Sequence, residues 1–407
     1  MLNIAYVAPY FHPATISFLR AVVELPGVRV GLVSGDPLSR LPPDLAWKLT
    51  AHYQIGAPLD PQQILDAVRA MVPRLGAPQL LLGTLEQLQV PLGQVREVLN
   101  LEGMKSAAAR NFREKSRMKH VLRAAGLPVA RHRLVDSVDA GLDFARNNGL
   151  PIVVKPPDGA GGKATYRANS LRELQQILHS LHPKRSRPIL CEEFVQGEER
   201  SFEVMSLAGA PVWWSSTRYS PTPLKVLENP WIQWTVTLPR EMNDPSDPNT
   251  RALGAKALQA LGMDTGLSHM EWFRRHDGTI AISEIGARPP GAQIVSMMSY
   301  AHNINMFQAW ANAVVFKKFN PPRRKFAAGT AFFRGQGEGS RVVAVEGLAE
   351  AQQKTGQHVV QAKLPRVGQA KADSYEGEGY AIVKHPETRI VDHALKVLIS
   401  TVRVRLG

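Results

Sequence analysis

The sequence predicts a mixed α/β protein with three parts: a small parallel sheet, a larger region with an antiparallel sheet, and a C-terminal α+β region. Near the N-terminus, buried strand patterns alternate with helical patterns, as in parallel-sheet domains. In the middle of the chain, strand patterns are separated by short turn signals, which is typical of antiparallel hairpins. Beyond residue 326, strands alternate with short helices.

These observations place the expected boundaries at residues 1–105, 106–317 and 318–407, with 318-KFNPPRRKF-326 as a linker. The first part contains the expected strands 2–8, 28–34 and 79–84 and the expected helices 15–25 and 60–72. Its first turn, 8-APYFHPA-14, has no glycine, so we expect no nucleotide to bind at that turn.

In the second and third parts, hydrophobic periodicity predicts further helices and strands. The expected helices are 113–126, 138–149, 171–181 and 247–262. The expected strands are 151–155, 188–194, 201–207, 212–219, 327–334 and 358–364.

Composition excludes several classes of protein. None of the 407 residues lies in an apolar run of membrane-spanning length, and the N-terminus lacks the pattern of a signal peptide. The single cysteine, Cys191, excludes an internal disulfide and favours the reducing cytoplasm. The net charge of +14 comes partly from basic clusters, but no nucleic-acid-binding module accompanies them, so these clusters suit a small polyanion better than a polynucleotide.

A glycine-rich loop, 152-IVVKPPDGAGGKAT-165, follows a strand that ends in Lys155. The loop fails the Walker pattern, because Pro157 and Ala164 stand at required glycine and hydroxyl positions. It matches G-x-G-x-x-A, but no helix opens directly after it, as the dinucleotide motif requires. The remaining interpretation is a hairpin flap whose backbone amides close over phosphates.

The stretch 269-HMEWFRRHDGTIAISEIGARPPG-291 carries the strongest chemical signal. Asp277-Gly278 predicts a two-residue hairpin turn, and a turn centred there places Glu271 opposite Glu284. Two carboxylates about 5 Å apart repel each other by roughly 3 kcal/mol, so a cation is expected between them. Mg²⁺ fits this requirement, and Arg288 follows just past the strand. A shifted register would instead leave one of the glutamates in solvent.

Together these features resemble the ATP-grasp ligase superfamily, in which two α+β subdomains hold ATP between them. The resemblance covers most of the chain. It implies ATP and Mg²⁺ as cofactors, Glu271 and Glu284 as metal ligands, and Arg288 as the catalytic arginine that stabilises an acyl-phosphate. The nucleotide-binding residues that it implies are Lys115, Lys155, Gly161, Gly162, Lys163, Glu192, Glu193, Val195 and Glu199.

One position departs from the family pattern. The family often reads Glu-x-Asn-x-Arg, whereas this chain reads 284-EIGAR-288, with Gly286 in place of the asparagine. The departure puts the coordination of a second magnesium in doubt.

The variant is most like the branch that contains the L-amino acid ligases. It implies an ATP-dependent ligase that joins small-molecule carboxylate and amine substrates through an acyl-phosphate, in the cytoplasm and without a membrane or nucleic-acid partner. A homodimer is compatible with this expectation. Two alternatives stay open: a biotin-carboxylase-like or purine-type carboxylase that phosphorylates bicarbonate, and a non-catalytic nucleotide- or nucleic-acid-binding protein.

Overall fold

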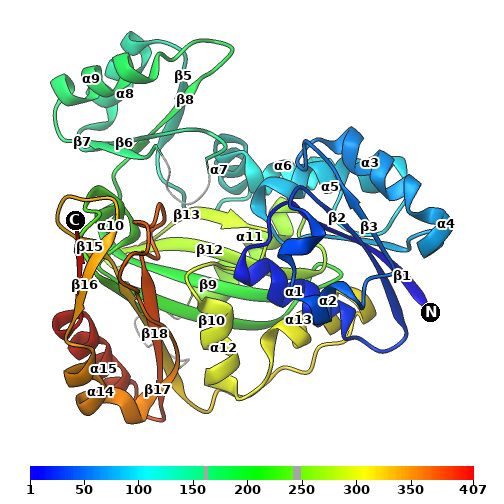
Figure 1. Ribbon diagram of the computed structural model, residues 1–407. Coiled ribbons are helices and arrows are strands. Elements are labelled where there is room, and N and C mark those ends of the chain that lie inside the picture. The colour runs from blue at the N-terminus through cyan, green and yellow to red at the C-terminus, as the bar shows by residue number, and fades with distance from the viewer. Residues whose placement is uncertain (160–163, 242–248) are drawn as a thin grey trace.

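A computed structural model describes residues 1–159, 164–241 and 249–407 of the chain. In this part of the chain the strands form four sheets, of four, eight, three and four strands (Figure 1). No helix in the described residues is both long and apolar enough to cross a membrane.

The N-terminal sheet is parallel and has the order β3-β2-β1-β4. Its strands are β1 (Leu2–Ala8), β2 (Val28–Ser34), β3 (Ala51–Gln54) and β4 (Leu80–Leu82). Alternate residues of β1 belong to two different cores: Ile4 and Tyr6 to one, Ala5 and Val7 to the other. Both faces of the strand are therefore covered, which explains its uninterrupted apolar run and confirms the predicted parallel sheet.

Helices connect and cover the strands of this sheet. They are α1 (Pro13–Val23), α2 (Pro43–Ala46), α3 (Pro61–Ala70), α4 (Val72–Leu75), α5 (Gln89–Val98) and the short 3₁₀ helices η1 (Leu38–Arg40) and η2 (Glu86–Leu88). Helix α3 begins at Pro61 because the Asp60 side chain accepts a hydrogen bond from the Gln63 amide.

A separate lobe contains the antiparallel sheet β5-β8-β6-β7, and it projects at the top of Figure 1. The lobe consists of β5 (His132–Val135), α8 (Val138–Asn148), β6 (Ile152–Lys155), β7 (Tyr166–Ala168), α9 (Leu171–Leu181) and β8 (Ile189–Glu193). The glycine loop joins β6 to β7, which pair as a hairpin, so the expected hairpin is confirmed. Gly161, Gly162 and Lys163 lie outside the described residues.

The largest sheet is antiparallel throughout, in the order β13-β12-β9-β10-β11-β14-β18-β17. Its strands are β9 (Gly197–Leu207), β10 (Ala210–Ser220), β11 (Trp234–Leu238), β12 (Gly266–Arg275), β13 (Ile280–Gly286), β14 (Ala327–Phe333), β17 (Val359–Lys363) and β18 (Gly379–His385). Strands on both sides of residue 318 thus share one sheet, and the predicted domain boundaries stay predictions.

The remaining elements surround this sheet. The helices are α6 (Ser106–Arg113), α7 (Lys115–Ala124), α10 (Pro223–Glu228), α11 (Thr250–Leu261), α12 (Ile294–His302), α13 (Met306–Phe316), α14 (Leu348–Thr355), the 3₁₀ helix η3 (Gly356–His358) and α15 (Thr388–Thr401). A small sheet near the C-terminus contains β15 (Gly335–Gln336), β16 (Val342–Glu346) and β19 (Arg403–Leu406).

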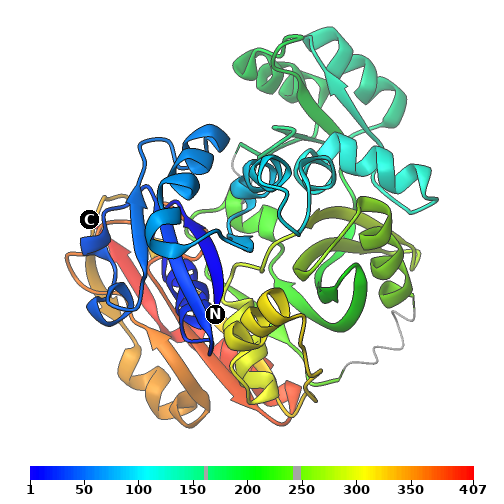
Figure 2. The ribbon, with the colours of Figure 1, turned by 90° about the vertical axis from the view of Figure 1, so that its right-hand side faces the viewer.

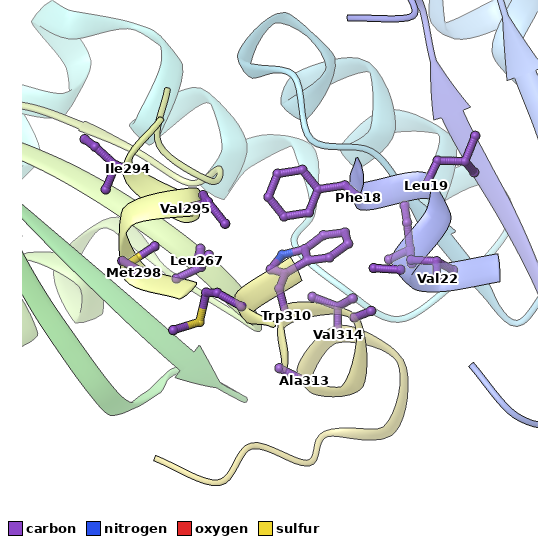
Figure 3. Close-up of a cluster of buried hydrophobic side chains, with 14 of the residues drawn as sticks. Phe18, Leu19, Val22, Leu267, Ile294, Val295, Met298, Trp310, Ala313 and Val314 are labelled. Carbon is purple, nitrogen blue, oxygen red and sulfur yellow. The ribbon is translucent and has the colours of Figure 1, made fainter. Parts of the chain in front are cut away.

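An apolar cluster joins the N-terminal part to the large sheet. Figure 2 shows the blue N-terminal elements beside the yellow helices α12 and α13. In Figure 3, Phe18 of α1 faces Trp310 of α13, and their ring centroids are 4.8 Å apart. Because both side chains are buried, this contact holds the N-terminal part against the large sheet.

The β12–β13 hairpin brings Glu271 opposite Glu284, as predicted. The predicted two-residue turn is wrong, however. Arg275 and Thr279 close a three-residue loop, in which Gly278 has a φ of +82°. The register shifts by one residue between Glu271 and Trp272, and this bulge returns the two glutamates to opposed positions.

Candidate active site

A cavity of about 420 Å³ is lined both by the small lobe and by the large sheet. The lobe contributes Lys155 at the end of β6 and Glu192 on β8. The sheet contributes Glu199 on β9, Glu271 on β12 and Glu284 on β13. The structure therefore brings the described residues of both predicted groups, nucleotide and metal, to one cavity.

The two opposed glutamates each have a cationic partner within the protein. Lys115 Nζ lies 2.8 Å from Glu284 Oε1, and His269 Nε2 lies 3.5 Å from Glu271 Oε1. The His269 contact lowers the pKa of Glu271 against the opposing effect of burial. Protein cations thus offset part of the repulsion that was taken to require a metal, so the repulsion argument alone does not establish Mg²⁺.

The donor set nevertheless fits Mg²⁺. The two carboxylates supply hard oxygen ligands from adjacent strands and leave room for phosphate oxygens, which is how proteins usually hold this ion. Among the described residues there is no cluster of three or more potential ligands, so an all-protein cage is not expected.

Glu192 accepts contacts from two buried lysines. Its carboxylate lies 2.8 Å from Lys155 Nζ and 3.2 Å from Lys119 Nζ. The two lysines lower the pKa of Glu192 to about 2 against the effect of burial. Lys119 Nζ also donates to the backbone oxygen of Ser283, at 2.7 Å, and so links α7 to the strand that carries Glu284.

The segment after β8 was predicted to bind the adenine and ribose of the nucleotide. Val195 is buried at the cavity wall, while the Glu193 carboxylate pairs with Arg131 and Arg275 at 2.6 Å each. Glu199 is buried at the cavity, and burial together with the neighbouring Glu271 raises its pKa well above the usual range.

Glu198 was considered as an alternative to Glu199 for the ribose hydroxyls. Its carboxylate pairs instead with Arg200 and Arg274, at 2.8 and 2.7 Å, and it does not line the cavity. Position therefore favours Glu199 for this role.

Arg288 is held by a residue from the N-terminal part of the chain. Its Nε and Nη2 donate to Glu86 Oε2 at 3.2 and 3.1 Å, and its Nη1 donates to the Pro289 oxygen at 3.1 Å. Arg113 also pairs with Glu86, at 3.2 Å. Glu86 therefore fixes the guanidinium fork at the cavity wall.

His269 is part of a chain of three ionisable groups, of which His269 and Glu203 are buried and Glu271 is partly exposed. Its Nδ1 lies 3.0 Å from Glu203 Oε1, while its Nε2 faces Glu271. Hydrogen bonds to these two carboxylates raise the pKa of His269 to about 9 against the effect of burial. The contacts of the ring with both carboxylates fix the orientation of Glu271, which was predicted to bind the metal.

Three of these residues were not predicted from the sequence: Lys119, Glu86 and Glu203. Lys119 follows Lys115 by four residues and so shares its helix face, which was an available signal. Glu86 follows the end of a parallel strand, where ligand-binding residues often lie. Nothing in the local sequence distinguished Glu203 from other strand residues.

Comparison with known proteins identifies the fold. Residues 120–302 match the family described as the ATP-grasp domain. They form an ATP-grasp domain. Among solved structures, the L-amino acid ligase from Bacillus licheniformis is similar over 100% of this chain and 99% of its own, with a TM-score of 0.80 and 20% identity.

Other relatives share the ATP-grasp fold. The N5-carboxyaminoimidazole ribonucleotide synthetase from Thermotoga maritima aligns over all of both chains, with a TM-score of 0.73 and 17% identity. The L-arginine-specific L-amino acid ligase of Bacillus subtilis is 24% identical over 262 residues. That match covers 63% of this chain and 62% of the Bacillus subtilis protein. At these identities the structures confirm the predicted three-part ATP-grasp architecture.

Proposed function

We propose that this protein is an ATP-dependent carboxylate–amine ligase that works through an acyl-phosphate and releases ADP and phosphate. The observation that carries the proposal is the single cavity that contains the opposed pair Glu271 and Glu284, the lysines Lys115 and Lys155, and Arg288. The Bacillus licheniformis ligase, which has the same fold, and the Bacillus subtilis ligase, which is similar in sequence, support it.

The residues suit the chemistry of this reaction. A carboxylate resists attack by an amine until its oxygen is phosphorylated, because phosphate is a far better leaving group than oxide. Lys155 and Lys115, which line the cavity, are proposed to bind the phosphates of ATP, and Arg288 is proposed to stabilise the charge on the transferring phosphoryl group. Held by Glu271 and Glu284, Mg²⁺ would offset charge on the phosphate oxygens.

The backbone of residues 192–195, which ends at the buried Val195, is proposed to form hydrogen bonds with adenine. The Glu199 carboxylate is proposed to accept hydrogen bonds from the ribose hydroxyls. The glycine loop, including Gly161, Gly162 and Lys163, is proposed to close over the phosphates. A cytoplasmic location and a homodimer remain predictions from the sequence.

Phosphorylation of bicarbonate is the second candidate reaction. The synthetase neighbour and a biotin carboxylase from Campylobacter jejuni, with a TM-score of 0.66 and 14% identity, share the fold. Bicarbonate has no side chain, so in this reaction the acceptor of the carboxyl group, and not the acid that is phosphorylated, would occupy the apolar end of the cavity, described below.

Hydroxylamine tests the proposal without knowledge of the amine, because it converts acyl-phosphates into hydroxamates. We expect ATP- and Mg²⁺-dependent hydroxamate formation with at least one organic acid, and no hydroxamate when bicarbonate alone is supplied. Calorimetry should show tighter binding of ATP than of GTP. ADP release that depends on bicarbonate and on no organic acid would favour the carboxylase, and equal affinity for both nucleotides would contradict the adenine assignment.

A further inference from the structure

At one end of the cavity lie residues to which the proposed function assigns no role in binding the nucleotide. The register of the large sheet places Phe273 of β12 opposite Glu199 of β9, and Tyr219 of β10 opposite Val236 of β11. Between β9 and β10, the next residues along, Arg200 and Arg218, are opposite each other in the backbone register. Glu199 therefore separates the predicted adenine side, next to β12, from a second region above β10 and β11.

This second region has an aromatic and aliphatic wall, which we term the apolar wall. The wall is formed by residues of β10, α10, β11, α12 and the segment before β18. They are Tyr219, Leu224, Leu227, Trp234, Ile294 and Tyr375.

The apolar wall is held in place from behind. The buried Arg334 donates through Nη1 to the backbone oxygens of Val226, at 2.7 Å, and Asn229, at 3.2 Å, and so anchors α10. Trp234 Nε1 donates to the Tyr375 oxygen at 2.8 Å, which satisfies the only polar group of the indole. The surface that Trp234 presents to the cavity is therefore apolar.

Charge is confined to the rest of the cavity. Its charged lining residues, among those that the structure describes, belong to the proposed nucleotide site, to the glutamate pair and its partner His269, or to Arg288 and its partner. They are Glu86, Lys115, Lys155, Glu192, Glu193, Glu199, His269, Glu271, Glu284 and Arg288. Glu376, next to Tyr375, accepts a hydrogen bond from Gln293 Nε2 at 3.2 Å and does not line the cavity.

Tyr375 connects the apolar wall to Arg288. Its ring centroid lies 5.8 Å from that of Trp234. Its hydroxyl lies close to Gly291: a Cβ atom added to Gly291 would be only 2.7 Å from it. Gly291 follows Arg288 by three residues. The apolar wall therefore lies next to the segment that carries Arg288, within reach of an acid whose carboxylate is activated there.

We propose that the apolar wall binds the side chain of the carboxylic acid substrate, and that this enzyme selects acids with an apolar side chain over acids with a charged one. The proposal rests on the ligase function argued above. A charged side chain placed there finds no charged residue among those that form the wall, and it loses its hydration, which is costly. The Bacillus subtilis relative is named as arginine-specific. A guanidinium finds no acidic partner on this wall, so the two proteins are expected to differ in substrate.

Three acids of the same chain length test the proposal: hexanoate, 6-aminohexanoate and adipate. With ATP, Mg²⁺ and hydroxylamine, we expect the kcat/KM for hexanoate to exceed those of the two charged acids by about a hundredfold or more. Calorimetry with each acid in the presence of ADP should give the same order of affinity. If 6-aminohexanoate or adipate matches hexanoate in both measurements, the proposal is wrong.

A charge placed on the wall should reverse the preference. Leu227 is partly exposed on α10, so Leu227→Glu is expected to fold and to shift the kcat/KM ratio at least tenfold toward 6-aminohexanoate. Leu171→Glu, at the exposed start of α9 and outside the cavity, is the matched control and should leave the ratio unchanged. An unchanged ratio in Leu227→Glu would contradict the assignment of the wall.

The two proposals fail in different ways. If neither these nor any other organic acid yields hydroxamate but hexanoate still binds more tightly than the charged acids, the ligase function fails and the apolar acid site stands. If hydroxamate forms equally well from all three acids, the ligase function stands and the selectivity does not.

Discussion

Replacing Glu192 with glutamine should destabilise the protein more than any change of a neighbouring surface carboxylate. Glu192 is buried between Lys119 and Lys155, and its pKa falls from 4.5 to about 2. That shift corresponds to about 3 kcal/mol of stability. Because the folded-state pKa is depressed, this stability is fully present above pH 4.5 and is lost as the pH falls toward 2.

In Glu192→Gln, both lysines lose the carboxylate while Lys119 stays fully buried. We expect the free energy of unfolding to fall by about 3 kcal/mol at pH 7, the range for a broken buried ion pair. The pKa of Lys119 is already lowered by burial and by Lys155. In the folded variant Lys119 therefore releases a proton that the unfolded chain keeps. The difference in the free energy of unfolding between the original protein and the variant should shrink as the pH rises from 7 to 10.

Glu193→Gln is the matched control, because Glu193 follows Glu192 directly but pairs with the more exposed Arg131 and Arg275. Urea unfolding of both variants at pH 7, 8.5 and 10 measures the effect, and we expect the control to lose about 1 kcal/mol or less. Equal losses in the two variants, or a deficit in Glu192→Gln that does not change with pH, would refute the reasoning.

Three further changes test other groups. Arg288→Lys loses the guanidinium fork that donates to Glu86. We expect the rate of single-turnover ADP formation to fall by about a hundredfold, while ATP affinity changes only a few-fold. If ATP affinity collapses and the chemical step is unaffected, Arg288 binds the phosphates of the ground state and does not stabilise the transition state. Glu284→Gln should abolish Mg²⁺-dependent turnover. Its free energy of unfolding, measured in urea, should fall by only about 1 kcal/mol, because the amide oxygen still accepts a hydrogen bond from Lys115. Ready unfolding of this variant would instead assign Glu284 a structural role. Burial lowers the pKa of His302 in the folded protein to about 4. As the pH drops, His302 takes up a proton in the unfolded chain before it does so in the folded protein, so stability falls between pH 6.5 and 4. His302→Gln should remove up to about 3 kcal/mol of that fall, and an identical pH profile in the variant would contradict this.

Local patterns were sufficient to bring together several residues of the candidate site. Lys155 ends a β-branched strand, and Glu271 and Glu284 flank a turn signal, so their placement depended on short-range periodicity and on a hairpin. The opposition of the two glutamates was predicted correctly, although the loop between their strands has three residues and a bulge compensates for it. Side chains alternate along a strand, so a bulge restores a register that the turn has shifted.

The tertiary structure alone decided which charges meet across the chain. Glu86 and Arg288 are 202 residues apart, and Lys119 contacts Glu192 from a different element. Such pairs depend on how the N-terminal sheet, the small lobe and the large sheet pack together, and no local pattern encodes that packing. The apolar wall has the same origin, because nothing in the sequence distinguishes Trp234, Ile294 and Tyr375 from other hydrophobic residues until the fold places them around one end of the cavity.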